Sequence, residues 1–73
     1  MSKRAKAIWR ATDGGPVSCA EKLKVLEQNL AEFRAQALDL LEDAALMGCD
    51  VEQVRHVLKE TLDEIDPRYA PHA

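Results

Sequence analysis

The feature that most constrains the fold is a set of apolar residues that recurs at alternating spacings of four and three between residues 18 and 47. This spacing places the apolar side chains on one face of an α-helix, in the pattern of a coiled-coil seam. A seam of this length needs a partner helix, because exposing a stripe of leucines to water is unfavourable. The seam consists of Cys19, Leu23, Leu26, Leu30, Phe33, Ala37, Leu40, Ala44 and Met47.

Local signals predict where this first helix begins and ends. Ser18 is followed by Glu21 at the spacing of a capping box, in which each side chain accepts a hydrogen bond from the other residue's backbone amide. Gly48 suits the left-handed conformation that commonly ends a helix. The sequence therefore predicts a helix over about residues 18–47.

A second, shorter helix is expected over about residues 50–66. Asp50 is a good N-cap, with Gln53 at the third helical position, and Pro67 prevents the helix from continuing. The apolar side chains of this segment also follow a helical spacing. The two helices are joined by about three residues, and so short a connection favours antiparallel neighbours. The predicted fold is therefore an all-α helical hairpin over residues 18–66, followed by a tail over residues 67–73.

The unequal helix lengths favour a homodimer. At the rise of an α-helix, the first helix spans about 43 Å and the second about 22 Å, so the second covers the first only as far as about Phe33. We expect two hairpins to form a four-helix bundle, which in outline resembles the Rop-type antiparallel hairpin dimer. Alternatively, Ile8 and Trp9 of the same chain fold back over the part of the first helix that the second helix leaves uncovered. The predicted interface residues are Leu23, Leu26, Leu30, Phe33, Ala37 and Leu40.

The charges are unevenly distributed along the chain. Residues 1–12 carry four Lys or Arg and no acid, whereas all 13 Asp and Glu fall later, against six basic residues. Residues 1–17 are therefore expected to form a basic N-terminal arm that ends in a Gly-Gly-Pro break. As an alternative function, this arm contacts nucleic acid through phosphate attraction and indole stacking, using Lys3, Arg4, Lys6, Trp9 and Arg10.

Histidine and cysteine chemistry gives weaker signals. Glu52, His56 and Glu60 follow each other at intervals of four and share a helix face, which makes them candidates for a metal- or ligand-binding bundle. The same interval is typical of ordinary surface pairs, so no cofactor is expected. Cys19 and Cys49 lie at opposite ends of the long helix, too far apart for a disulfide within one chain. An antiparallel dimer would bring Cys19 of one chain toward Cys49 of the other.

The sequence contains no nucleophile elbow, phosphate-binding loop or acid–base constellation, so catalysis is not expected. It also has no apolar stretch long enough for a membrane span and no signal-peptide pattern, and two cysteines in such a chain favour a reducing cytoplasm. The expected function is that of a non-enzymatic, dimeric helical adaptor or regulatory protein that binds itself and a larger protein.

Overall fold

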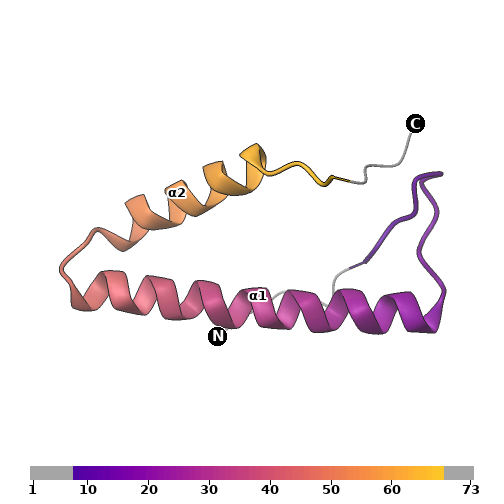
Figure 1. The fold of residues 1–73 in the computed structure, drawn as a ribbon, viewed down its shortest axis with the longest axis horizontal. Coiled ribbons are helices and arrows are strands. Elements are labelled where there is room, and N and C mark those ends of the chain that lie inside the picture. Colours follow the sequence, from indigo (N-terminus) through magenta and orange to yellow (C-terminus); the bar gives the residue numbers. More distant parts are fainter. Residues whose placement is uncertain (1–7, 69–73) are drawn as a thin grey trace.

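The computed structural model describes residues 8–68, which form a hairpin of two helices (Figure 1). Helix α1 comprises Ala20–Leu46 and helix α2 comprises Val51–Glu64. The all-α hairpin predicted from the sequence is therefore confirmed, with each helix slightly shorter than expected. Three predicted nucleic-acid contacts and the end of the tail lie outside the described residues: Lys3, Arg4, Lys6 and residues 69–73.

The predicted N-cap of α1 is wrong. Cys19, not Ser18, is the N-cap, and its side chain makes no capping hydrogen bond. The first helical bond runs from the Leu23 amide to the Cys19 carbonyl, at 3.0 Å. Two residues before Cys19, the Val17 amide donates to the Trp9 carbonyl at 2.8 Å. Ser18 lies between this contact and the N-cap, outside the helix.

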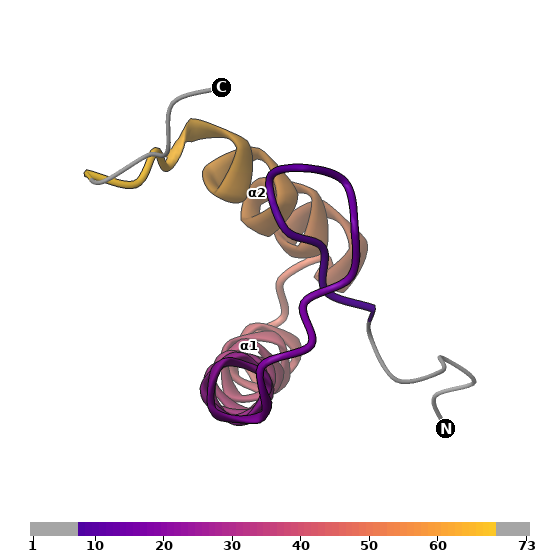
Figure 2. The same ribbon diagram turned by 90° about the vertical axis from the view of Figure 1, so that its right-hand side faces the viewer.

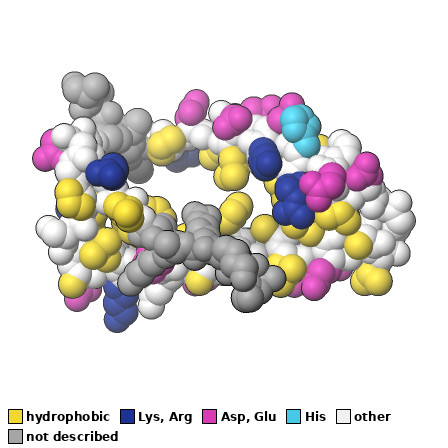
Figure 3. Space-filling model, turned by 180° about the vertical axis from the view of Figure 1, so that it is seen from behind, with side chains coloured by type: hydrophobic (Ala, Val, Ile, Leu, Met, Phe, Trp, Pro, Cys, Tyr) yellow, Lys and Arg dark blue, Asp and Glu magenta, His cyan; other side chains and the backbone are white. Residues whose placement is uncertain are grey.

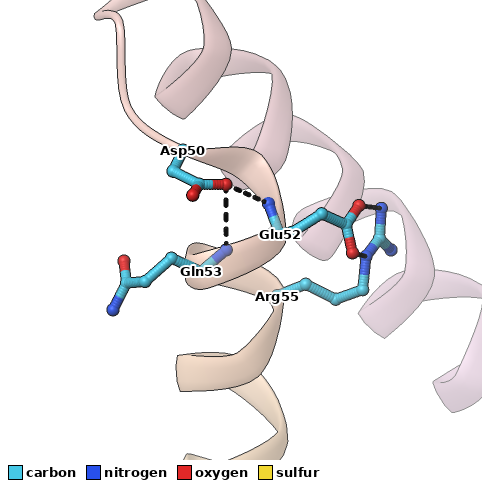
Figure 4. A network of polar contacts seen from close by, with 4 residues as sticks. All are labelled: Asp50, Glu52, Gln53 and Arg55. Carbon is cyan, nitrogen blue, oxygen red and sulfur yellow. Dashed lines mark hydrogen bonds and ion pairs between the residues drawn. The ribbon is translucent and has the colours of Figure 1, made fainter.

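The connection between the helices agrees with the sequence signals. Gly48 has a φ of 84°, and the amides of Gly48 and Cys49 donate to the carbonyls of Ala45 and Ala44, respectively. These two bonds form a Schellman motif, which satisfies carbonyl groups at the end of α1. An Asp50 carboxylate oxygen then accepts hydrogen bonds from the amides of Glu52 and Gln53, which confirms the predicted N-cap of α2 (Figure 4).

Helix α2 ends two residues before the predicted boundary. Its C-cap is Ile65, with φ −87° and ψ 120°, so the chain becomes extended before Asp66. Pro67 explains an early stop, because it offers no amide to continue the helix and disfavours a helical conformation at Asp66. The two helices are closest at the Gly48 turn and diverge away from it (Figure 1). Between residues 8 and 68 only Ala44 is buried, with 4% of its surface exposed.

Residues 8–17, here called the N-terminal loop, fold back at the N-terminal end of α1, which faces the viewer in Figure 2. Arg10 and Pro16 pair in an antiparallel manner, and the Ala11 amide donates to the Gly15 carbonyl at 2.7 Å. The reversal is made by Gly14, whose φ of 93° disfavours any side chain, and by Asp13, which accepts from the Gly15 amide at 2.9 Å. The predicted Gly-Gly-Pro break is thus a closed turn.

Candidate interaction surface

The predicted seam of α1 divides into two rows that differ in exposure. The inner row faces the rest of the chain: Leu23, Leu30 and Ala37 are half-buried and Ala44 is buried. The outer row also recurs every seven residues but is largely uncovered, since Phe33, Leu40 and Met47 are 46%, 43% and 74% exposed. The outer row consists of Leu26, Phe33, Leu40 and Met47, of which only Leu26 is half-buried.

Helix α2 also presents an apolar face that runs beyond its contact with α1. Val51, Val54 and Leu58 are half-buried, but Leu62 and Ile65, at helical spacings on the same face, are 52% and 62% exposed. The reason is the divergence of the helices. Figure 3 shows the result, an opening between α1 and α2 with hydrophobic side chains around it. The expectation that α2 covers α1 as far as Phe33 is therefore wrong, because contact ends closer to the turn.

A column of polar residues runs beside the outer row, on the side away from the inner row. Its members recur every seven residues and are all exposed, so they form one continuous edge of α1. We call this column the polar edge. From the start of the helix to its end it consists of Lys22, Asn29, Gln36 and Asp43, so it begins with a cation and ends with an anion. The same heptad spacing is present in the sequence, but the predicted interface omits these polar residues because it was based only on the apolar ones.

Trp9 is held against α1 by a contact that the sequence did not reveal. Its indole nitrogen donates a hydrogen bond of 2.5 Å to the Glu27 carboxylate, and its side chain is half-buried. The alternative in which the arm folds back on the long helix is therefore correct for Trp9, but not for Ile8, which is 74% exposed. Arg10 donates to the Gly14 carbonyl at 3.2 Å. The two described nucleic-acid candidates thus both have partners within the chain.

The three metal candidates of α2 do not converge. Glu52 pairs with Arg55 at 3.4 Å (Figure 4), whereas His56 pairs with Glu60 at 3.3 Å. Each of these pairs lies on the exposed surface, as expected for neighbours three or four residues apart on a helix. Over residues 8–68 no group of three or more His, Cys, Asp or Glu side chains is placed to hold a metal ion.

Both cysteines are exposed free thiols. The backbone amides of Lys22 and Glu21, at the start of α1, lower the pKa of the Cys19 thiol because they favour the charged thiolate. Cys19 borders an open depression of about 420 Å³ between the N-terminal loop and the first turn of α1. Lys22 also lines this depression, while its side chain stays exposed.

Comparisons of the chain with protein-family models, with curated proteins and with solved structures each found no match. Neither described helix is long and apolar enough to cross a membrane. The function is therefore inferred from the outer row of α1 and from the exposed part of the apolar face of α2.

Proposed function

We propose that this protein is a small, non-enzymatic helical adaptor or regulatory protein that dimerises through the outer row of α1 and the open face of α2. The observation that carries the proposal is the exposure of Phe33, Leu40 and Met47 in a row of otherwise regular heptad spacing. Fully burying one such side chain is worth roughly 1.5–3 kcal/mol. Because Phe33 and Leu40 are already more than half buried, a two-fold dimer gains only the remaining part of this contribution, once in each copy, as the two hairpins together form a four-helix bundle.

The dimer is tested by sedimentation equilibrium of the full, reduced chain carrying Leu40→Asp. A carboxylate in the outer row should abolish dimerisation, because a charge would be buried without a partner. Leu38→Asp is the matched control: Leu38 is 53% exposed against 43% for Leu40, but it lies outside both rows. If both variants remain dimeric, or both dissociate, the outer row is not the interface. The same measurement without residues 1–17 shows whether the N-terminal loop contributes.

The adaptor role requires a second partner, and the exposed carboxylates of α2 are the proposed docking site. Affinity capture should retain one protein on the wild-type chain and lose it when three of these acids are changed to Lys, namely Glu60, Asp63 and Glu64. Equal retention by both chains would contradict docking through this face.

We assign the protein to the cytoplasm, since two free, exposed thiols suit a reducing compartment.

Nucleic-acid binding by the arm is the weaker proposal. Stacking on a base would require Trp9 to leave Glu27, and the Glu27 carboxylate lies where a phosphate would be repelled. Binding of a single-stranded oligonucleotide that falls steeply with salt and is lost in Trp9→Ala would favour this alternative over the adaptor.

A further inference from the structure

The geometry points to an antiparallel pairing of α1 with α1 of a second copy, in a register centred on Phe33, so that Lys22 of each copy meets Asp43 of the other. This inference rests on the proposed dimer and specifies its contact surface. It starts from the order of side chains along the polar edge, which is cation, amide, amide and anion. Turning this edge end over end places opposite charges together at both ends.

Three pairs of residues share this centre, as the common seven-residue spacing of the two rows requires; the opposite charges of Lys22 and Asp43 are the feature that the spacing does not impose. Lys22 with Asp43, Asn29 with Gln36, and Leu26 with Leu40 are each placed symmetrically about Phe33 to within one residue. The same two-fold axis therefore brings charge to charge, amide to amide and apolar side chain to apolar side chain. An interface with two-fold symmetry requires this reciprocity, since any contact from residue i to residue j must be repeated from j to i.

A second copy accounts for the opposite charges at the two ends of the polar edge better than another protein does, because only a second copy sets each end of this edge against the other end of the same sequence. A parallel arrangement of two copies is disfavoured for an electrostatic reason. It would place Lys22 against Lys22 and Asp43 against Asp43, and like charges in contact oppose association.

Among residues 8–68, most of this surface is left open, although Lys22 borders the depression beside the N-terminal loop and Leu26 is half-buried. Ala37, Leu41 and Ala44 show by their burial that α2 covers the inner-row side of α1. Trp9 contacts Glu27, which lies across the seam from the polar edge, so the N-terminal loop does not cover the outer row there. Leu62 of α2 and Ile65, its C-cap, extend the apolar surface available to the second copy.

Charge reversal tests the register directly. Lys22→Asp and Asp43→Lys each create two repulsive pairs in an antiparallel dimer, and each should raise the dimer Kd about tenfold at low salt. The double variant restores opposite charges and should return Kd to within about twofold of wild type. Within one helix these two positions lie about 31 Å apart by the helical rise, so rescue can only come from contact between copies.

Misfolding does not account for the expected weakening. An acid near the start of a helix and a base near its end are favourable to the helix dipole, so each single variant should keep or gain helicity. Lys24→Asp and Glu42→Lys are matched controls, with the same charge changes close by on the opposite, exposed face of α1. Both should leave Kd within about twofold of wild type.

Sedimentation equilibrium of the full, reduced chain distinguishes the outcomes. Weakening by both single variants and rescue by the double variant support the register. A dimer that ignores all four positions, or that is weakened additively by the double variant, overturns the register while the proposed dimer stands. A wild-type chain that remains monomeric at all concentrations overturns both, and the outer row then belongs to another partner.

Discussion

Asp50 provides a sharp test of how α2 is held, through the substitution Asp50→Ala. One carboxylate oxygen of Asp50 accepts from the Glu52 amide at 3.0 Å and from the Gln53 amide at 3.3 Å (Figure 4). Losing an N-cap of this kind costs about 1 kcal/mol, and losing a negative charge at a helix start costs a further 0.3–1 kcal/mol or so. We expect a total loss of about 1.5 kcal/mol in the free energy of unfolding.

The control for this prediction is Ser18→Ala. The sequence pattern predicts a cap at both positions, but the structure places Ser18 before the N-cap of α1. Urea unfolding followed by far-ultraviolet circular dichroism, at one chain concentration, should show a clear loss for Asp50→Ala and almost none for Ser18→Ala. Asp50→Asn keeps the acceptor and should lose only the charge contribution. Equal losses at Asp50 and Ser18, or no loss at Asp50, would refute the structural assignment of the caps.

Two further predictions concern the N-terminal loop and its junction with α1. Glu27→Ala should release Trp9 and increase acrylamide quenching of its fluorescence, whereas Glu32→Ala should not, because the indole donates to Glu27. The lowered pKa of Cys19 means that its thiolate forms at lower pH than that of a small model thiol. In the Cys49→Ser variant, the rate of alkylation of Cys19 should therefore begin to rise at lower pH than the rate for the model thiol. Unfolding in urea should move the pH profile of Cys19 toward that of the model thiol. A profile unchanged by unfolding would contradict the contribution of the helix amides.

The sequence predicted the hairpin because its signals are local. The heptad spacing of α1 lies within one segment, and the Gly48 and Asp50 signals each depend on backbone groups a few residues away. These elements were found at nearly the expected residues. The end of α2 was misplaced by two residues because Pro67 stops a helix without fixing which earlier residue is its last.

The errors arose where distant residues decide the outcome. Just before α1, Val17 is bonded to Trp9, a contact that no pattern around Ser18 reveals. The contact of Trp9 with Glu27 joins residues 18 positions apart. The divergence of α2 also lies beyond periodicity, since spacing shows which side chains share a face but not how closely a second helix approaches it. The predicted interface residues were consequently found in two rows of different exposure.

These rows connect the stability of the hairpin with its proposed function. A helix as short as α2, with 14 residues, is marginal when isolated, and most helical stability in proteins comes from packing an apolar face. The described chain buries only Ala44, so its own core contributes little. If a second copy covers Phe33 and Leu40, association and folding draw on the same side chains, and a substitution in the outer row weakens both. Reversing charges on the polar edge separates the two effects, because it changes association while leaving the apolar contacts and the helix intact.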